Sequence, residues 1–194
     1  MSQNYFIMLP GGPWAGPNSV QISGEKVDLL DGSLITKDFK EPFNFELRVD
    51  SQADNPLDFP PLDYFIGSEG RLLMSQRFIE CLKNISVTNI QLFDTTTKYV
   101  PTGEFLPYKL VNIIGAISAL DKEKSECIVD ADGFVEAFET LSLDESKIKG
   151  FDIFRLYERL GLIVISKRVK ECIISNGLTG IDIISDNEWE PEMI

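Results

Sequence analysis

The chain of 194 residues contains no histidine, which removes the commonest catalytic base and the commonest metal ligand. A Ser-His-Asp or Cys-His nucleophile arrangement is therefore impossible, and so is every zinc site that contains histidine. Cysteine is also scarce. Cys81, Cys127 and Cys172 are far apart, form no CxxC pair and cannot supply a four-thiolate zinc site. We expect them to be reduced, mostly buried thiols of a cytoplasmic protein.

The chain also lacks a long apolar run. Its N-terminus has no basic region ahead of the short apolar stretch, which is unlike a signal peptide. The longest largely apolar window, 110–120, spans 11 residues, about half of what a membrane helix needs. We therefore expect no contact with a membrane. The composition, 43% hydrophobic and 25% charged, is typical of a soluble folded protein with an apolar core.

What the chain has in excess is acid, and this acid is concentrated in two stretches. The net charge of −13 comes from 31 Asp and Glu against 18 Lys and Arg. Residues 121–145 contribute −7 and residues 182–194 contribute −5, which leaves −1 for the rest of the chain. Either stretch alone is typical of a solvated face. Together they predict a one-signed surface that attracts a basic partner and repels nucleic acid.

The candidate partner-binding residues are acids of these two stretches and the tryptophan among them. They are Glu123, Glu126, Asp130, Asp132, Glu136, Glu139, Asp186, Glu188, Trp189, Glu190 and Glu192. Trp189 has two interpretations: an aromatic anchor for the partner, or a side chain that packs the C-terminal tail onto its own domain. We predict no catalytic, cofactor-binding or metal-binding residue and no cofactor.

One acidic segment imitates a calcium site. Residues 128–139 match an EF-hand loop at its glycine, its last glutamate and two acidic positions, but Ile128 stands where the first carboxylate belongs. The flanking residues alternate as strands do. We therefore predict a tight hairpin turn at 130–133, between strands at 126–129 and 134–138, with acids on the solvent face.

An internal repeat marks the second half of the chain. Residues 73–82 and 164–173 share the pattern apolar-apolar-Ser-x-Arg-x-x-Glu-Cys-apolar at an offset of 91 residues. In each copy the serine predicts a helix N-cap after a strand, and a second strand pattern follows the helix. We predict an α+β fold of mixed or antiparallel sheets and a few short helices, with two pseudo-equivalent strand–helix–strand units. The alternative is a chance likeness between two capped amphipathic helices.

The first half is rich in turns and short strands. The predicted extended segments are 5–9, 20–22, 27–30 and 43–49. Three prolines follow between residues 56 and 61, where we place a boundary. Residues 1–56 are then an N-terminal β-rich extension or subdomain, and residues 57–194 an α+β domain with an acidic C-terminal tail.

Several short motifs, taken in order, resemble a known family. They are Pro61-Leu62-Asp63-Tyr64-Phe65 and the segments 72–75, 108–114, 120–121, 125–126, 143–144, 153–156, 163–166 and 177–181. Their order over residues 57–185 is similar to that of the Imm11 family of bacterial polymorphic-toxin immunity proteins, while the first 55 residues match nothing. The resemblance implies a non-enzymatic, cytoplasmic α+β protein that binds and neutralises a cognate toxin delivered between competing bacteria. It implies no catalytic residues and no particular interface.

Three hypotheses of function follow. In the leading one, the chain is an immunity protein whose acidic patches bind a toxin with a basic surface. In the second, it is a non-enzymatic scaffold or regulatory module for another protein; the gene beside its own would discriminate between the two. The third is a carboxylate-based, metal-dependent hydrolase, which a divalent metal ion would stabilise on titration. The oligomeric state is left open.

Overall fold

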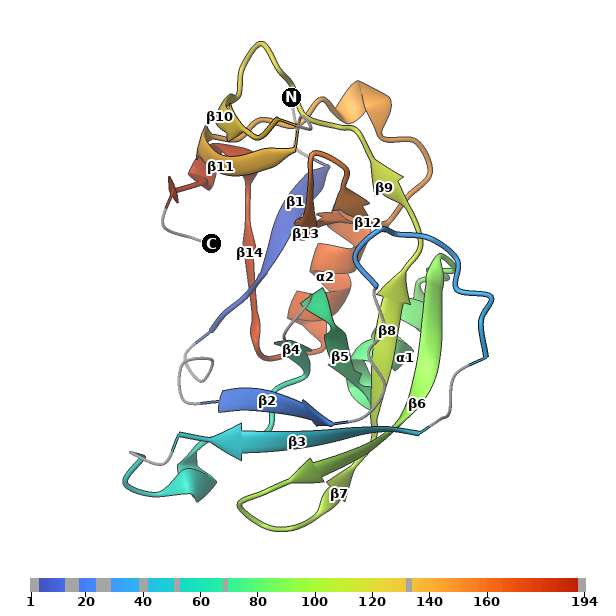
Figure 1. The fold of residues 1–194 in the computed structure, drawn as a ribbon, viewed down its shortest axis with the longest axis vertical. Helices are drawn as coiled ribbons and strands as arrows, with labels where there is room; N and C mark the ends of the chain where they lie inside the picture. Colours follow the sequence, from blue (N-terminus) through green and yellow to red (C-terminus); the bar gives the residue numbers. More distant parts are fainter. Residues whose placement is uncertain are drawn as a thin grey trace.

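The structure, a computed structural model, is built mainly from strands (Figure 1). It describes residues 4–12, 18–23, 29–38, 42–50, 53–67, 70–131 and 134–191. The strands are β1 (Tyr5–Pro10), β2 (Asn18–Ser23), β3 (Phe43–Val49), β4 (Tyr64–Ile66), β5 (Leu72–Ser75), β6 (Ile90–Tyr99), β7 (Phe105–Leu106), β8 (Tyr108–Ile113), β9 (Ala116–Ile117), β10 (Glu126–Val129), β11 (Val135–Thr140), β12 (Ile153–Leu156), β13 (Arg159–Ser166) and β14 (Ile181–Ile184). The helices are α1 (Gln76–Asn84) and α2 (Lys167–Ser175), with 3-10 turns η1 (Pro56–Asp58), η3 (Glu145–Lys147) and η4 (Asp186–Glu188).

The strands form two large sheets and one hairpin. The five-stranded sheet has the order β14-β1-β13-β12-β9, and the seven-stranded sheet has the order β2-β3-β6-β8-β5-β4 with β7 paired to β6. Strands β10 and β11 pair only with each other. Most pairs are antiparallel, but β3 is parallel to β6 and β9 is parallel to β12. The predicted α+β fold with mixed sheets is confirmed.

The alternation of side chains along each strand distributes them between three apolar clusters. In β1, Phe6 and Met8 face the cluster that contains both helices, whereas Ile7 and Leu9 face the cluster beneath β11. In β5, Met74 joins the helices and Leu73 joins a third cluster on the far face of the seven-stranded sheet. The five-stranded sheet and strands β4, β5 and β8 of the seven-stranded sheet therefore bury residues on both faces, whereas β3 buries only one. The cluster that contains the helices lies between the two sheets and is shared by them.

The internal repeat is real structure. Strand β5 leads through Ser75 into α1 and then β6, and β13 leads through Ser166 into α2 and then β14. Each serine caps its helix: Ser75 Oγ accepts a hydrogen bond from the N–H of Phe78, and Ser166 Oγ accepts one from the N–H of Val169. The two helices end alike too, because Ser86 and Gly177, 91 residues apart, both have a positive φ just past the last turn.

Each copy adds a buried or half-buried aspartate that the repeat pattern did not include. Asp63 Oδ1 accepts a hydrogen bond from Ser75 Oγ at 2.5 Å, and Asp152 Oδ1 accepts one from Ser166 Oγ at 2.6 Å. The other oxygen of Asp63 pairs with Arg77 at 3.2 Å. Equivalent contacts join Asp152 to Arg168 at 3.1 Å. Each aspartate thus ties the start of the strand that follows it, β4 or β12, to the first turn of its helix.

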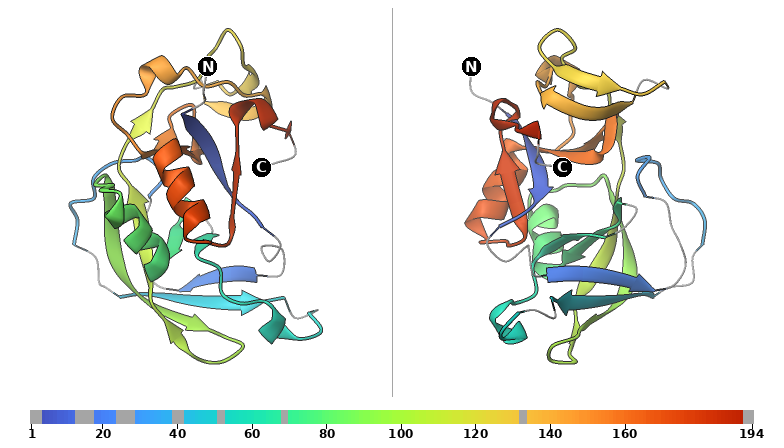
Figure 2. Two further views of the ribbon diagram at one scale, coloured as in Figure 1. Left: turned by 180° about the vertical axis from the view of Figure 1, so that it is seen from behind. Right: turned by 60° about the vertical axis from the view of Figure 1, so that its left-hand side comes forward.

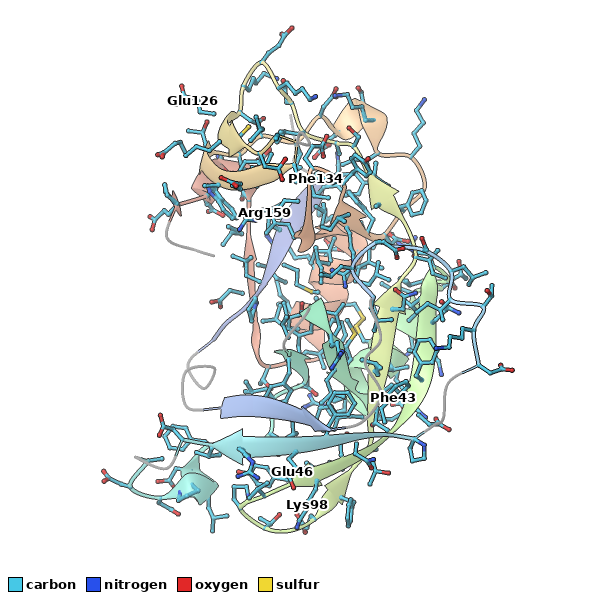
Figure 3. All side chains as sticks on the ribbon, viewed as in Figure 1. Phe43, Glu46, Lys98, Glu126, Phe134 and Arg159 are labelled. Carbon is cyan, nitrogen blue, oxygen red and sulfur yellow. A yellow bond between two sulfur atoms is a disulfide. The ribbon has the colours of Figure 1, made fainter. Side chains whose placement is uncertain are left out.

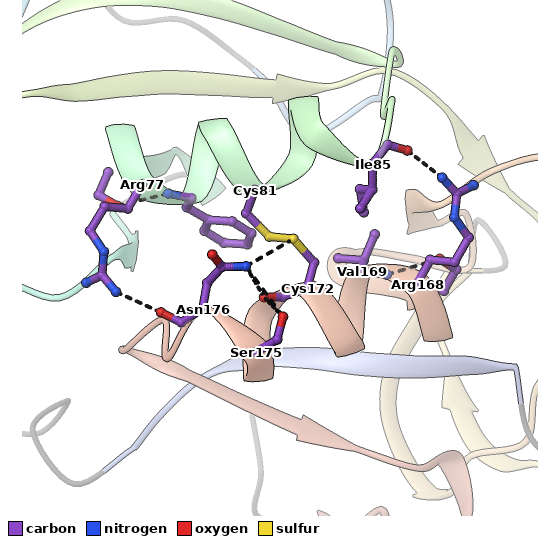
Figure 4. The surroundings of a disulfide bond; sticks show 11 residues. Arg77, Cys81, Ile85, Arg168, Val169, Cys172, Ser175 and Asn176 are labelled. Carbon is purple, nitrogen blue, oxygen red and sulfur yellow. Dashed lines mark hydrogen bonds between the residues drawn. A yellow bond between two sulfur atoms is a disulfide. The ribbon is translucent and has the colours of Figure 1, made fainter.

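The two arginines also link the helices to each other. Helices α1 and α2 lie side by side and antiparallel (Figures 2 and 4). Arg77 donates to the carbonyl oxygen of Asn176 at the end of α2, and Arg168 donates to that of Ile85 at the end of α1. Cations at helix C-termini stabilise the orphan carbonyls there. The contacts are reciprocal, as expected of a pseudo-twofold relation.

A disulfide joins the helices at the middle of this arrangement. Cys81 and Cys172, separated by 91 residues, are bonded across the helix pair (Figure 4). The expectation of three reduced thiols is therefore wrong for two of them, because the repeat brings equivalent cysteines face to face. Both are buried, as expected. Cys127 is free and half-buried.

The described strands of the first 56 residues belong to both large sheets. Strand β1 lies between β13 and β14, and β3 is paired with β6. The division of the chain at residue 56 stays a prediction. The extended segments at 5–9, 20–22 and 43–49 are confirmed as β1, β2 and β3. The segment predicted at 27–30 is not a strand at residues 29–30, and residues 27–28 lie outside the described chain.

Candidate protein-binding surface

The predicted hairpin forms one end of the molecule. Strands β10 and β11 pair in an antiparallel register, with Ile128 opposite Ala137, and the backbone N–H of Asp130 donates to the carbonyl oxygen of Phe134 at 2.9 Å. In Figures 1 and 2 this hairpin lies at the end opposite β2, β3 and β7. The described residues of this segment, 128–131 and 134–139, thus belong to an antiparallel hairpin and are not flanked by helices as an EF-hand loop is.

The acidic C-terminal tail packs against this hairpin. Trp189 Nε1 donates to the carbonyl oxygen of Phe138 at 3.2 Å, and the two rings meet edge to face with centroids 5.7 Å apart. Asp186 Oδ2 accepts a hydrogen bond from the N–H of Leu143 at 2.8 Å. The two acidic stretches, far apart in the sequence, therefore meet. We call the surface formed by the described acids of 121–145 and 186–190 the acidic end.

Trp189 is a packing residue of the tail. It is 8% exposed and belongs to the apolar cluster beneath the hairpin, together with Phe138. The ring is therefore largely covered by its own domain. Of the two interpretations, the structure shows the packing of the tail on its own domain.

Several of the acids serve the local fold. Asp121 pairs with Lys124, and this hydrogen bond lowers the pKa of the Asp121 carboxyl below its usual range. Asp130 Oδ1 accepts from the N–H of Phe134 and closes the hairpin turn. Glu188 accepts from the N–H of Ser185 in a capping box, and this bond lowers the pKa of its carboxyl.

Glu145 and Asp144 also have structural roles. Both carboxylate oxygens of Glu145 accept hydrogen bonds from Asn4, and Oε1 accepts another from the N–H of Tyr5, which fixes the start of β1. Asp144 Oδ1 accepts from the hydroxyl of Ser146 at 2.6 Å and from its N–H, and the bond from the hydroxyl above all holds the pKa of Asp144 low. Substitution of either residue would disturb the fold as well as the charge.

A second group of acids faces solvent and makes no such structural hydrogen bonds within the described residues. Glu126, Glu136, Glu139 and Glu190 are exposed, and their carboxylates make no hydrogen bond or ion pair with any residue the structure describes. Glu123 is exposed beside Lys124. Asp132 and Glu192 lie outside the described residues. The unengaged glutamates are the ones that remain available to a partner.

The hairpin is held to the rest of the protein by the turn between β12 and β13 and by the first residue of β13. The N–H of Val135 donates to the carbonyl oxygen of Glu158 at 2.7 Å. Arg159 donates to the carbonyl oxygens of Val135 and Glu136, and burial lowers the pKa of its guanidinium group (Figure 3). Arg159, the basic side chain in these contacts, therefore donates its hydrogen bonds to backbone carbonyls of β11 and does not neutralise the glutamates nearby.

The sequence reasoning missed the apolar part of this surface. Ile128 and Val129 are each 55% exposed, Tyr157 is 51% exposed and Phe134 is 37% exposed. The rings of Phe134 and Tyr157 contact each other with centroids 5.8 Å apart. A signal was present in the sequence, because Ile128 and Val129 are consecutive apolar residues in a strand whose neighbours are acidic.

Comparison with known proteins identifies the family. The family model described as "Immunity protein family (Imm11)" matches residues 6–185 of the 194. The chain belongs to the Imm11 immunity protein family. The match includes β1 and β3, so the earlier limit of the resemblance to residues 57–185 was wrong. That limit reflected the lack of recognisable motifs in the first 55 residues. A search of curated proteins finds no match.

Membership of Imm11 indicates an immunity function. Two further observations on this Imm11 protein concern metal ligands and membrane-spanning helices. Within the described ranges, no three Cys, Asp or Glu side chains come together in a way that could hold a metal ion. No helix among the described residues is long and apolar enough to cross a membrane.

Proposed function

We propose that this protein binds and neutralises a cognate toxin, and that the acidic end is the surface that attracts it. The observation that carries the proposal is the meeting of the two acidic stretches, with Glu126, Glu136, Glu139 and Glu190 left unengaged, in a chain of an immunity family. An inhibitor of this kind acts by occupying a surface and needs no chemistry of its own.

The charge argument defines the partner. Acids gathered at one end create a field that raises the encounter rate with a basic surface by about 10- to 1,000-fold. Toxins that act on nucleic acids present basic clefts, since they must bind phosphates. We propose that the partner is such a basic protein, and that neither nucleic acid nor a membrane binds this chain.

The proposed location is the cytoplasm of the cell that makes the toxin. This part of the proposal now depends on the family alone, because the Cys81–Cys172 bond removes the support expected from reduced cysteines.

The test is co-expression with the product of the neighbouring gene, the candidate toxin. We expect the wild-type chain to restore growth and to co-purify with the toxin, with less complex retained at high salt. A triple variant, Glu126→Lys, Glu136→Lys and Glu139→Lys, should protect less well. The carboxylates at these positions are exposed and make no hydrogen bond with a described residue, so folding should be preserved.

A matched variant controls for net charge. Asp54→Lys, Asp58→Lys and Glu104→Lys change the charge equally but lie near η1 and in the loop between β6 and β7, at the opposite end (Figure 1). We expect this variant to protect as the wild type does. Equal protection by both triple variants would refute the acidic end as the steering surface. Absence of rescue and of complex with the wild type would refute toxin binding and favour the scaffold hypothesis.

A further inference from the structure

We propose that the exposed apolar residues of the acidic end form an anchor that the toxin buries. The anchor consists of Ile128, Val129, Phe134 and Tyr157. This inference rests on the proposed function and adds to it the kind of surface that the toxin must present: an apolar patch surrounded by basic side chains.

The anchor residues come from two separate segments that the fold brings together. Phe134 directly precedes β11, and Tyr157 lies in the turn between β12 and β13; the centroids of their rings are 5.8 Å apart. The hydrogen bond from the N–H of Val135 to the carbonyl oxygen of Glu158 fixes this neighbourhood. The ring pair is thus held in place before any partner arrives, which lowers the entropic cost of binding.

These apolar side chains stay partly exposed in the folded chain. The hairpin already contributes Val135 and Phe138 to the core, and both are buried. Ile128 and Val129 remain 55% exposed on the partner strand. Large apolar groups in water are unfavourable, and a group of them on one surface marks a site of interaction.

Acids of both hairpin strands lie close to the anchor in the ladder, and their charge favours a basic occupant. Glu126 precedes Ile128 on β10, while Glu136 adjoins Ala137, the residue opposite Ile128 in the ladder. Protein interfaces are built in the same way, with aromatic side chains at the centre and polar groups at the rim that exclude water. A basic rim on the toxin would complement these acids.

A second copy of this chain fits the anchor poorly. A symmetric dimer through the same surface would bring the glutamates of both copies together, and like charges in contact oppose association. A polyanionic nucleic acid is repelled for the same reason. The charge of the rim therefore points to a basic protein as the occupant.

The experiment measures toxin association and dissociation rates for Phe134→Ala, Tyr157→Ala and the double variant. We expect the double variant to dissociate at least about tenfold faster, with its association rate and salt dependence little changed, since anchors act mainly on dissociation. Phe105→Ala is the matched control, because Phe105 is a 68% exposed aromatic on β7 at the opposite end. We expect it to bind as the wild type does. Far-UV circular dichroism and the thermal midpoint verify that each variant is folded.

The outcomes separate this inference from the proposed function. The anchor is refuted, and toxin binding retained, if the double variant dissociates as the wild type does while the triple lysine variant associates more slowly. If the wild type does not bind the toxin, both are refuted. If the chain alone forms a dimer in sedimentation velocity that Phe134→Ala and Tyr157→Ala dissolve, the occupant is a second copy and the proposed partner is wrong.

Discussion

Replacement of Asp63 by Asn should destabilise the fold more than the same replacement at Asp152, although the two residues occupy equivalent places in the repeat. The Asp63 side chain is 5% exposed and that of Asp152 is 21% exposed. Asp63 also accepts more hydrogen bonds than Asp152. Beyond the bonds from Ser75 and Arg77, its Oδ2 accepts from the N–H and the hydroxyl of Thr179, at 2.9 and 3.2 Å.

The magnitude follows from these partners. An asparagine keeps one acceptor oxygen but turns the other into a donor, which would face the donors of Thr179 and Arg77. Hydrogen bonds to a buried charge contribute about 1.5–3 kcal/mol each, and a buried donor left unpaired costs about 1–3 kcal/mol. Arg77 is 61% exposed and regains water, which limits the loss. We expect about 2–3 kcal/mol for Asp63→Asn and about 1 kcal/mol for Asp152→Asn.

Urea unfolding, followed by circular dichroism, measures both values as shifts of the midpoint at constant slope. Arg77→Gln and Arg168→Gln serve as matched controls, and each should cost about 1 kcal/mol or less because both side chains are mostly exposed. An Asp152→Asn variant that is as destabilised as Asp63→Asn, or more so, would refute the argument from burial and hydrogen bonding.

Three further predictions concern other parts of the fold. Reduction of the Cys81–Cys172 bond should lower the free energy of unfolding by up to about 4.5 kcal/mol, because it frees a loop of 91 residues in the unfolded state. Identical urea midpoints with and without reductant would contradict the presence of a stabilising disulfide. Trp189→Ala should cost about 2–3 kcal/mol and increase amide exchange in residues 186–191, whereas unchanged exchange would contradict packing of the tail. Burial raises the pKa of Tyr64 and Tyr108 above the usual 10.0, so their contribution to stability is complete below pH 10 and is lost as pH rises further. Absorbance at 295 nm should therefore show their ionisation only with unfolding, and full ionisation near pH 10 in a native protein would contradict their burial.

The helices were predictable because their signals are local. Ser75 and Ser166 each precede an apolar pattern of helical spacing, and both serines cap the helices as expected. The hairpin was predictable for the same reason, since its turn residues are consecutive in the sequence. The order of the strands in the sheets was not predictable from the sequence. Strand β1 pairs with β13 and β14 at the far end of the chain, and no local pattern carries such a pairing.

The disulfide was missed although its signal was present. The offset of the repeat, 91 residues, equals the separation of Cys81 and Cys172. Two copies related by a pseudo-twofold axis can bring equivalent residues together at that axis. The expectation of reduced thiols came from the scarcity and spacing of cysteine, and it did not use the repeat.

The aspartates of the repeat were hidden by a difference in loop length. Asp63 and Asp152 are 89 residues apart, two fewer than the offset of the helices, because the connection between Asp152 and Ser166 is two residues longer than the one between Asp63 and Ser75. A comparison of residues 62–65 with 151–154 would have found them, since both read apolar-Asp-x-Phe.

The acidic end could be anticipated as charge but not as geometry. The sequence could not indicate that Asp186 and Trp189 bring the tail to the hairpin, because both contacts go to residues far away in the chain. Nor could it separate the glutamates that face solvent from the acids that bond to nearby backbone. That separation depends on where backbone N–H groups point once the strands have formed.

The most direct test of the proposed function is the association rate of the toxin at several ionic strengths. It should be measured for the wild type, for the lysine variant at Glu126, Glu136 and Glu139, and for the matched lysine variant at the opposite end. The proposal predicts a rate that falls with salt for the wild type and the matched variant, and a slower, nearly salt-independent rate for the variant of the acidic end. Equal rates and equal salt dependence for all three proteins would contradict it.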